Sequence, residues 1–551
     1  MPQLQRHVIH LDHLSLTDGE SNVAIIREVT RTIMASEGNH VTLTIAPGVY
    51  PIRNPLGTLL FEELLMGRRD PRDDAGWRRD RNPLFDWRNC RGLEVDGQGS
   101  VFLFEGLVQP FAWFECHDVT VKNLTIDWKR PPYSEGIIRR IDGEVYEVEL
   151  DPEYPLYDGS PVVAVHEYDP GERRLTGVCL YYNPDVKLVR PGYVQLSHTN
   201  ASAMKVGNTV FIRPIYSYAP ALQFYRCEQV RVENVVLHAN PGMGIIGHLC
   251  HDIDIRGLQV KPSPGRLMSI NVDATHFISC TGTVSLEHCY FEGMGDDASN
   301  IHSFYMQMVR REGPDVVHVR IDANPQDFYP ELAFAGDEIE FVRGDTLKPY
   351  AVGTIEQVEV VEESSFRIKF RSPLPEDLHA EDLLSNVSRL AAYRFANCHV
   401  NNIRGRGVLI QTRDGVVENN VFENCTGQGI HVNTATGWWE SGATRDITLR
   451  NNRFVNCGFG FGGYCRAVGI VVETECAKPE IGVHQRLEIV DNFVWGTNSK
   501  PGFIISRAEH VTVTGNTIER CPTAIEIDYS KAVELSDNRL GGGAVVWGEQ
   551  T

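Results

Sequence analysis

The chain has 551 residues, 52 of them basic and 73 acidic, which gives a formal net charge of −21. This balance excludes a general affinity for nucleic acid or anionic membranes, since both repel a negatively charged protein. No apolar run approaches the roughly 18 residues that cross a bilayer, and the N-terminal MPQLQRHVIHLDH lacks the apolar core of a signal peptide. We expect a soluble chain with no membrane span, secreted or periplasmic only if an export signal has been removed.

The first predicted element is a helix over residues 21–37, with Asn22 as its N-cap and Gly38 as its stop. One face of this helix carries four apolar residues, Ile25, Ile26, Val29 and Ile33. An alternating strand, VTLTI at 41–45, follows. A helix in this place suits the end of a β-helix, because an open first coil would expose a sheet edge and a bare core. We therefore predict an N-terminal capping helix.

A strand motif recurs along most of the chain: an apolar-x-apolar strand, a polar bend residue and a second short strand. Copies begin at Val119 (VTVKNLTI), Val230 (VRVENVVL), Ile253 (IDIRGLQV), Val284 (VSLEHCYF), Tyr393 (YRFANCHV), Gly415 (GVVENNVF), Ile447 (ITLRNNRF), Leu487 (LEIVDNFV), Val511 (VTVTGNTI) and Val533 (VELSDNRL). The tightest spacings are 22, 23 and 24 residues, which fits three short strands and three turns per coil. Asn and Gly tolerate the left-handed bend, and stacked Asn side chains can hydrogen-bond between coils. The motif predicts an all-β protein built as a right-handed parallel β-helix.

Two intervals between copies are much longer than one coil. Val119 to Val230 spans 111 residues and Val284 to Tyr393 spans 109, which leaves about 85 residues beyond one coil each time. Both excesses have alternating, turn-rich β patterns, so we predict two small β-barrel insertions. The chain then divides into an N-terminal part of the β-helix (1–133), a first barrel (134–216), a central part (217–303), a second barrel (304–390) and a C-terminal part (391–551).

Thirteen cysteines are scattered along the chain without the paired short spacings of zinc sites. Several of them lie at or just beyond a copy of the strand motif. We interpret them as buried, reduced packing residues, and we predict no cofactor and no metal.

The stretch from Ile270 to His302, INVDATHFISCTGTVSLEHCYFEGMGDDASNIH, concentrates polar side chains. Its three aspartates are Asp273, Asp296 and Asp297, and beside them lie the candidate substrate-binding residues His276, Asn300 and His302. Asp273 and Asp296 are 23 residues apart, close to one coil. One coil therefore presents one acid and the next presents a pair, roughly 4.8 Å away along the stack.

Grouped carboxylates suit the cleavage of glycosides. One carboxyl, kept protonated, donates to the leaving oxygen, and an ionised one activates water or attacks the sugar. Adjacent carboxylates resist joint ionisation, which pushes one pKa upward. Asp296 and Asp297 reach the same cleft only if the chain bends near them, which Gly293 and Gly295 permit. We predict that Asp273, Asp296 and Asp297 are catalytic.

These motifs carry a resemblance. NVDATHF, then GDDASNIH one coil later, and WWESG at 438–442 resemble the corresponding motifs of glycoside hydrolase family 110, bacterial exo-acting α-1,3-galactosidases that act on blood group B-type and related linear glycans. Members of that family are described as a β-helix with two barrel insertions. The resemblance implies an inverting, metal-independent hydrolase of terminal α-galactosyl oligosaccharides or glycoconjugates, with Asp273 as general acid and Asp296 and Asp297 as candidate bases. The pattern departs at Ser303, where the family motif has glycine.

Three further candidates lie on a later coil. Trp438 and Trp439 follow Gly437 and can offer a flat face to galactose, and Glu440 can accept hydrogen bonds from its hydroxyls. The alternative is a packed aromatic pair beside a surface acid.

The histidines and arginines near the acids allow more than one role. His276 and His302 orient carboxylates, bind sugar hydroxyls, or are buried and satisfied. Arg404, Arg406 and Arg413 follow the second long interval and are weaker candidates for ligand contact.

Two other functions stay open. A polygalacturonase-like pectin hydrolase also uses a lone Asp and an Asp pair on neighbouring coils, but its substrate needs a basic groove, which the acidic total does not favour. A non-catalytic glycan-binding β-helix accounts for stacked Asn and aromatic residues, but it has little reason to crowd two acids at a bend. We expect no nucleic acid partner, and a homodimer is compatible with the sequence.

Overall fold

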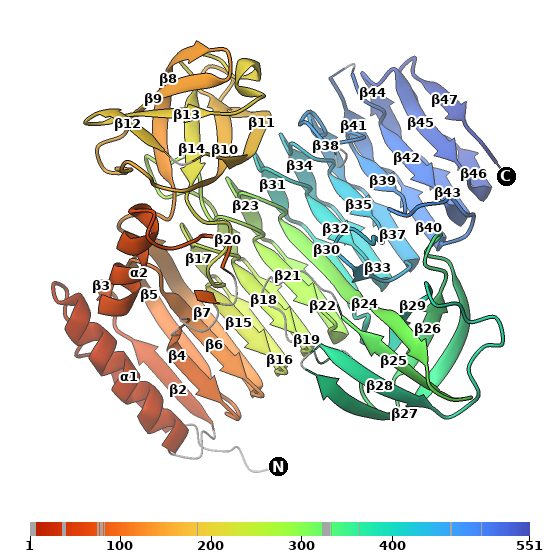
Figure 1. Cartoon of the computed structure of the whole chain (residues 1–551), viewed down its shortest axis with the longest axis horizontal. Coiled ribbons are helices and arrows are strands. Elements are labelled where there is room, and N and C mark those ends of the chain that lie inside the picture. Colours follow the sequence, from red (N-terminus) through yellow and green to blue (C-terminus); the bar gives the residue numbers. More distant parts are fainter. Residues whose placement is uncertain are drawn as a thin grey trace.

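The structure, a computed structural model, describes residues 7–35, 40–73, 76–77, 81, 83–184, 186–321, 331, 333–362, 364–462, 465–497 and 499–550. Its body is a right-handed parallel β-helix, in which the chain winds through three stacks of parallel strands (Figure 1). Two smaller antiparallel units project from this body, and a helix lies against its first coil. The predicted fold class is confirmed.

The first two stacks hold the two strands of the repeated motif. The first stack contains β1 (His7–Leu11), β2 (Val41–Ile45), β16 (Glu228–Glu233), β19 (His251–Arg256), β22 (Thr281–Glu287), β30 (Ala392–Ala396), β33 (Arg413–Glu418), β37 (Arg445–Arg450), β40 (His484–Val490), β43 (Ala508–Thr514) and β46 (Lys531–Ser536). The second contains β3 (Val49–Arg53), β17 (Val236–Leu237), β20 (Gln259–Val260), β23 (Tyr290–Glu292), β31 (His399–Asn401), β34 (Val421–Glu423), β38 (Arg453–Val455), β41 (Phe493–Trp495) and β44 (Thr517–Glu519). The long strands β5 (Glu94–Glu105) and β7 (His117–Trp128) run through both stacks.

The third stack carries the face on which the site is built. It contains β4 (Pro83–Arg88), β6 (Gln109–Phe114), β15 (Leu222–Tyr225), β18 (Ile245–His248), β21 (Thr275–Ile278), β24 (Ser299–Arg311), β32 (Val408–Ile410), β35 (Ile430–Val432), β39 (Ile470–Val472), β42 (Phe503–Ser506), β45 (Thr523–Asp528) and β47 (Ala544–Trp547). Phe277 pairs with Ile301 and Ile301 with Ile410, and all three belong to the apolar core. Since side chains alternate along a strand, the neighbouring column of His276, Asn300, Leu409 and His431 points outward.

The bend between the first two stacks has the left-handed conformation that the motif predicts. The bend residues are Asn123 (φ 54°), Asn234 (51°), Gly257 (65°), His288 (56°), Asn397 (55°), Asn419 (57°), Asn451 (54°), Asp491 (53°), Gly515 (69°) and Asp537 (54°). In the C-terminal half the next residue is Asn, and its side-chain amide donates to the Asn oxygen one coil on. This ladder joins Asn420, Asn452, Asn492, Asn516 and Asn538, with N···O distances of 2.9, 3.0, 3.0 and 2.9 Å. The predicted coil-to-coil hydrogen bonds are confirmed.

The chain leaves the β-helix at both edges of the third stack. The first insertion precedes this stack and is a seven-stranded antiparallel sheet of β8 (Ser134–Asp142), β9 (Val145–Leu150), β10 (Val162–Asp169), β11 (Arg174–Asn183), β12 (Lys187–Arg190), β13 (Tyr193–Ser197) and β14 (Thr209–Arg213), with the short helix η1 (Ala201–Ala203). The second follows it and is formed by the outer half of β24 with β25 (Val316–Arg320), β26 (Glu338–Val342), β27 (Pro349–Glu362), β28 (Ser365–Phe370) and β29 (Leu383–Asn386), which leads into η2 (Val387–Arg389). The two insertions therefore flank the outer face of the third stack. The exact five-part division of the chain stays a prediction.

The predicted capping helix is α1 (Gly19–Ala35), which packs on the first coils. Its predicted N-cap was wrong: backbone N–H groups of the first turn donate to Asp18 (3.1 and 3.2 Å). Asn22 lies inside the helix and is buried, with its amide nitrogen donating to the carbonyl oxygens of Ser15 and Pro51 (2.7 and 2.9 Å). The buried amide of Asn22 satisfies two backbone carbonyl groups and ties the helix to β3, so Asn22 does not cap the helix.

A second helix, α2 (Pro55–Leu65), was not predicted. Asn54 caps it by accepting from the backbone N–H of Leu56 (3.1 Å). Its apolar face, with Leu64 at the centre, packs into the core of the first insertion. Among the described residues, no helix is long and apolar enough to cross a membrane.

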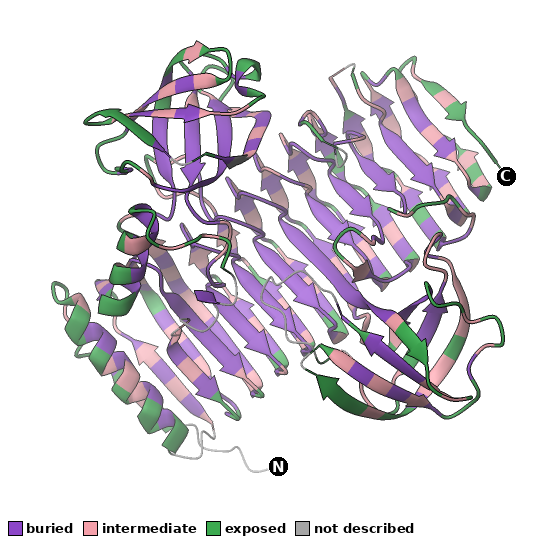
Figure 2. Cartoon of the chain, viewed as in Figure 1, coloured by how far each residue is buried: buried purple, intermediate pink, exposed green. Residues whose placement is uncertain are grey.

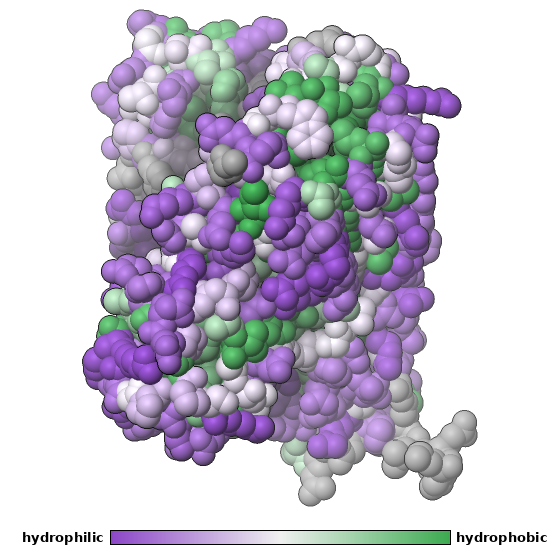
Figure 3. All heavy atoms as spheres, turned by 90° about the vertical axis from the view of Figure 1, so that its right-hand side faces the viewer, coloured by the Kyte–Doolittle hydropathy of each residue, from purple (hydrophilic) through white to green (hydrophobic). Residues whose placement is uncertain are grey.

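The two ends of the β-helix differ. Among the described residues no helix covers the last coil, where Val546 and Trp547 are 42% and 51% exposed. Figure 3, a view from the side on which the C-terminal coils lie, shows hydrophobic residues gathered in the upper half of this surface.

The interior of the β-helix is one continuous apolar core. Figure 2 shows burial along its central strands, with exposed residues on α1 and on the outer strands of the insertions. All thirteen cysteines are unpaired, and all except Cys179 and Cys476 are buried, so the predicted packing role is confirmed.

Candidate active site

The three predicted acids lie in the turns that lead from the second stack into the third. Asp273 comes two residues before β21, and Asp297 comes two residues before β24. One carboxylate oxygen from each of Asp273, Asp296 and Asp297 lies within 4.8 Å of the others. The structure therefore brings the three carboxylates together at one corner of two adjacent coils.

The register differs from the spacing inferred from the sequence. The backbone N–H of Ala274 donates to the carbonyl oxygen of Asp297 (2.9 Å), and Thr275 pairs with Ser299. Asp273 therefore stands beside Asp297, 24 residues on, and not beside Asp296. Asp296 lies one position earlier, after Gly295, where a Cβ would come within 2.1 Å of the carbonyl oxygen of Asn271. This close approach turns the chain so that both neighbouring acids reach the same corner.

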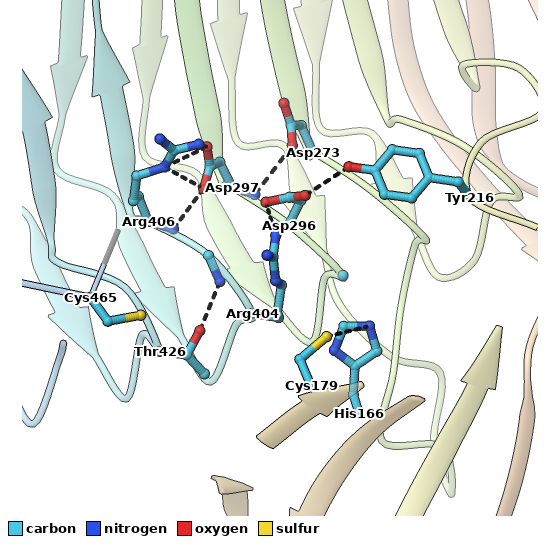
Figure 4. Close-up of polar contacts among 12 residues, drawn as sticks. His166, Cys179, Tyr216, Asp273, Asp296, Asp297, Arg404, Arg406, Thr426 and Cys465 are labelled. Carbon is cyan, nitrogen blue, oxygen red and sulfur yellow. Dashed lines mark hydrogen bonds and ion pairs between the residues drawn. The ribbon is translucent and has the colours of Figure 1, made fainter. Parts of the chain in front are cut away.

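Asp297 is held by Arg406 from the next coil (Figure 4). The backbone N–H of Arg406 donates to Oδ1 (2.6 Å), its Nε lies 3.0 to 3.1 Å from both oxygens and its Nη2 lies 2.7 Å from Oδ2. Gly405 makes this approach possible, because at its φ of 122° a Cβ would lie 2.6 Å from Oδ1 of Asp297. Asp297 is thus the acid of a buried, fork-shaped ion pair.

Asp296 has two partners from different parts of the chain. Arg404 donates from Nη1 to Oδ1 (2.5 Å), and the hydroxyl of Tyr216, just after β14, donates to Oδ2 (3.1 Å). Burial raises the pKa of Asp296, against the opposing charge of Arg404. Burial also raises the pKa of Tyr216 well above its ordinary value, so the hydroxyl keeps its proton and donates. The first insertion therefore reaches the site through Tyr216.

Asp273 faces histidine instead of arginine. Its Oδ2 lies 2.7 Å from Nδ1 of His276, and its Oδ1 accepts from the backbone N–H of Asp297 (3.2 Å). Nε2 of His276 lies 2.7 Å from Nε2 of His302, whose Nδ1 lies 2.7 Å from the carbonyl oxygen of Ser303. Burial, with Asp296 and Asp297 nearby, raises the pKa of Asp273 well above its ordinary value. This carboxyl therefore holds its proton where an ordinary aspartate is ionised.

Glu440 closes the other side of the histidine pair. It lies in β36 (Glu440–Ser441), which pairs with β24, and its Oε1 is 3.7 Å from Nε2 of His302. The side-chain amides of Asn300 and Gln411 donate to its two oxygens (3.4 and 2.5 Å). Burial works against ionisation, but the charge of Arg406 and the hydrogen bond from Gln411 help to hold the pKa of Glu440 below its ordinary value. Glu440, whose side chain is 14% exposed, is therefore a largely enclosed carboxylate and not a surface acid.

Two more residues support the site on the side of Arg406. His431, in β35, lies with Nδ1 3.5 Å from Nη1 of Arg406 and Nε2 3.0 Å from Glu473. Glu473 also pairs with Arg466. Although Glu473 is buried, His431 and Arg466 lower its pKa to about 2. Asp297 is thus one end of a chain of contacts that runs through Arg406, His431 and Glu473 to Arg466.

The two tryptophans differ in their surroundings. Trp439 packs against the apolar core of the second insertion, its φ is 59° and its carbonyl accepts from the backbone of Tyr305 (2.7 Å). Trp438 is 47% exposed. A galactose platform at these residues stays a prediction. Arg413 lies farther along and pairs with Glu340 of the second insertion (2.7 Å).

Sequence reasoning missed several members of this site. Gln411 and Glu473 each follow an apolar strand of the third stack directly, and this placement is the signal that could have found them. Tyr216 gave no such signal, because it comes from the end of the first insertion. Arg404 and Arg406 were named as weak ligand contacts, and in the structure they hold Asp296 and Asp297.

Three groups of side chains bring metal-ligating atoms within 4.8 Å: Asp273, Asp296 and Asp297; His276, His302 and Glu440; and His431, Glu473 and Glu475. In the first and third groups, guanidinium groups already neutralise carboxylates. In the second, both nitrogens of each histidine face hydrogen-bond partners. We assign no metal ligand, and metal independence stays a prediction.

The site is closely packed. Asp273, Asp296 and Asp297 are 5%, 9% and 1% exposed, so a sugar ring enters only when neighbouring side chains make room. Asp296 is the most accessible of the three.

Several known proteins are similar to this chain. Alpha-1,3-galactosidase B of Bacteroides thetaiotaomicron is 27% identical over 486 residues, which cover 82% of this chain and 78% of that protein. Alpha-1,3-galactosidase A of Bacteroides fragilis is 26% identical over 455 residues, which cover 78% of this chain and 74% of that protein. The resemblance predicted from the three motifs is confirmed.

Family models and solved structures also match. Residues 325–384 match the GLAA-B beta-barrel domain II, and residues 387–543 match the periplasmic copper-binding protein NosD. The mannuronan C-5 epimerase AlgE4 A-module of Azotobacter vinelandii aligns over 98% of this chain and 94% of its own, with 10% identity and a TM-score of 0.45. An exopolygalacturonase of Thermotoga maritima aligns over 97% and 93%, with 13% identity and a TM-score of 0.44.

Proposed function

We propose that this chain is an exo-acting glycoside hydrolase that removes terminal α-1,3-linked galactose from glycans. Its similarity to a bacterial protein named alpha-1,3-galactosidase B, over 82% of its length, supports this proposal. One observation carries the proposal: three carboxylates meet at one corner in unlike surroundings, one beside histidine and two paired with arginine. Burial raises the pKa of the carboxyl beside histidine well above its ordinary value. A protonated and an ionised carboxyl at one point are what glycoside hydrolysis needs.

Asp273 is the general acid in this proposal. Its raised pKa keeps a proton available at a higher pH than in an ordinary aspartate, and it gives this proton to the oxygen that leaves the galactose. Asparagine at this position removes the proton but keeps the shape. Asp273→Asn should therefore lose activity on galactosides of poor leaving groups and keep it on α-galactosyl fluoride, whose leaving group needs no proton.

Asp296 is the better placed of the two candidate bases. Three donor groups, all from Arg406, already use the lone pairs of Asp297, whereas Asp296 accepts from only Arg404 and Tyr216 in the described structure. A carboxylate has about four lone-pair sites, so Asp296 keeps acceptors for a water molecule. Azide should restore turnover to Asp296→Asn by replacing that water, and it should not restore Asp297→Asn.

We propose inversion at the anomeric carbon, which the resemblance implies. The nearest oxygens of the acids lie within 4.8 Å, closer than the roughly 6.5–9.5 Å between carboxyl groups of inverting enzymes, so the acids must separate to admit water. Proton NMR of the first-formed sugar decides the point. β-Galactose supports inversion, and α-galactose would show a retaining mechanism.

Glu440, Asn300 and Gln411 are the proposed acceptors for galactose hydroxyls. Each amide donates to Glu440, and its own oxygen, Oδ1 of Asn300 or Oε1 of Gln411, is buried without a hydrogen-bond partner. Buried acceptors without donors favour a ligand that brings hydroxyl groups.

The function is tested by screening nitrophenyl glycosides and then defined α-galactosyl oligosaccharides. Release of galactose from α-1,3-linked termini supports the proposal. Reducing-end release from polygalacturonate, or binding of galactosides without any hydrolysis, would overturn it in favour of a pectin hydrolase or a glycan-binding protein.

A further inference from the structure

A chain of short contacts runs from Asp273 to a backbone carbonyl. Oδ2 of Asp273 meets Nδ1 of His276 (2.7 Å), Nε2 of His276 meets Nε2 of His302 (2.7 Å), and Nδ1 of His302 meets the carbonyl oxygen of Ser303 (2.7 Å). Every contact lies between buried atoms from β21, β24 and the turn before β21. At these distances each contact needs one hydrogen between its two heavy atoms.

The carbonyl fixes the direction of the chain. A carbonyl oxygen only accepts, so Nδ1 of His302 carries a hydrogen. Burial lowers the pKa of His302 to about 4, so this ring is neutral and its Nε2 has only a lone pair. Nε2 of His276 must then be the donor. If His276 is neutral, its Nδ1 has a lone pair as well, and the hydrogen facing it comes from the carboxyl of Asp273.

Loss of that proton leaves an unfavourable contact in every arrangement of the two rings. An ionised Asp273 would face the lone pair of Nδ1 in His276. If His276 moved its hydrogen to Nδ1, two Nε2 lone pairs would meet, and if His302 also changed tautomer, its Nδ1 lone pair would face the carbonyl of Ser303. Two acceptors that face each other at 2.7 Å repel, whereas the same two atoms with a hydrogen between them form a stabilising hydrogen bond. The chain therefore favours one proton on the pair formed by Asp273 and His276.

Other charged and titratable groups also face this pair. Asp296 and Asp297 lie beside Asp273, and Glu440 stands near His302. Arg406 opposes them from the next coil, and the buried His248 lies on the preceding strand, with a pKa lowered to about 3 by burial. The three carboxylates favour protonation of Asp273 and the guanidinium opposes it. The histidine chain adds a local requirement, set by hydrogen-bond direction and not by net charge.

We propose that His276, held by His302 and the carbonyl of Ser303, is the positioning residue that keeps the proton on Asp273. This rests on the proposed hydrolase function. As the glycosidic C–O bond breaks, the Asp273 proton passes to the leaving oxygen, and the attacking water gives a proton to Asp296. Asp273 must then take up a proton before the next turnover, and the opposed acceptors left in the chain favour that uptake. Because the anchor is a backbone carbonyl, serine at 303 serves as well as glycine.

Histidine tautomers test the proposal without any activity assay. Long-range proton–nitrogen spectra of the full chain labelled with ¹⁵N-histidine, assigned with His276→Phe and His302→Phe, report which ring nitrogen carries hydrogen. The expected result is a neutral His302 protonated on Nδ1 from pH 5 to 8. A His302 protonated on Nε2 would overturn the proposal even if the enzyme hydrolyses galactosides, and a chain inactive on galactosides with the expected tautomer would overturn only the proposed function.

The pH profile of kcat/KM is the second readout. In His302→Leu, His276 is free to place its hydrogen on Nδ1 and donate to an ionised Asp273, so the alkaline limb should move down by about one pH unit. Activity above the optimum should then fall about tenfold more than activity at the optimum. His302→Gln keeps an acceptor for His276 and should restore the wild-type limb. His318→Leu, which removes a buried histidine bonded to Ser365 in the second insertion (2.6 Å), is the matched control and should keep that limb. A uniform loss in His302→Leu with an unmoved limb would overturn the proposal.

Discussion

Asp273 and Asp297 occupy the same place on adjacent coils, yet their surroundings are opposite. The coil before Asp273 contributes the apolar Met243 and Ile246, and its side partner is a histidine. The coil after Asp297 contributes Arg406, which donates through its backbone and its side chain. One acid is pushed to the neutral form and the other is held in an ion pair. In this pair, the protonation of each aspartate is set by the neighbouring coil that the other aspartate does not touch.

The largest effect should come from Asp273→Asn, which removes the acidic proton that distinguishes Asp273 from Asp297. We expect kcat/KM on an α-1,3-galactoside to fall by about 10²- to 10⁴-fold, the usual contribution of general acid catalysis. Hydrolysis of α-galactosyl fluoride should fall much less. Equal losses on both substrates would contradict the assigned role.

Arg406→Met removes the ion-pair partner of Asp297. Asp297 would be left as a buried charge without its partner, which costs about 3–5 kcal/mol of unfolding free energy. Urea denaturation followed by circular dichroism measures this loss. The double variant Arg406→Met with Asp297→Asn removes both charges and should recover most of it. A stable single variant would show that Asp297 is not ionised in the folded protein.

His431 acts on the same side at one remove, because it contacts Nη1 of Arg406 and is itself held by Glu473. We expect His431→Ala to lower kcat by about tenfold with little change in KM, less than the roughly 10²-fold cost of displacing a catalytic group by 1 Å. His431→Gln keeps an oxygen for Arg406 and should lose less. Steady-state kinetics of the two variants tests this order.

The smallest effect concerns stability and its dependence on pH. The folded-state pKa of Asp273 is raised above its unfolded value, so its protonated form stabilises the fold fully at low pH and this stabilisation is lost as pH rises. Asp273→Asn does not titrate. Its melting temperature should therefore gain on the wild type by a few degrees as pH rises from 4 towards neutrality. A gap that narrows over this range would mean that the acid is stabilised as a carboxylate.

The repeated strand motif was enough to predict the coils, their left-handed bends and the asparagine ladder, because each depends on residues close in sequence. The same coil length brought Asp273 near the acid pair. It did not give the register, since the turns between the second and third stacks vary in length and one residue exchanges Asp296 for Asp297 as the neighbour. Partners such as Tyr216 and Arg406 lie across coils or come from an insertion, and such contacts leave no local pattern. The polar residue at the start of α1 misled for a similar reason, because Asn22 binds groups outside the helix.

The strand β24 is 13 residues long and passes without a break from the third stack into the second insertion. Asn300 and His302 sit near its start, Ser303 and Phe304 pair with β36, and Tyr305 to Gln307 pair with β29. The second insertion is therefore not a detachable module. A variant that removes this insertion, or replaces it with another domain, must keep β24 as far as its pairing with β36. Otherwise His302 is displaced, and His276, which contacts Asp273, loses its partner.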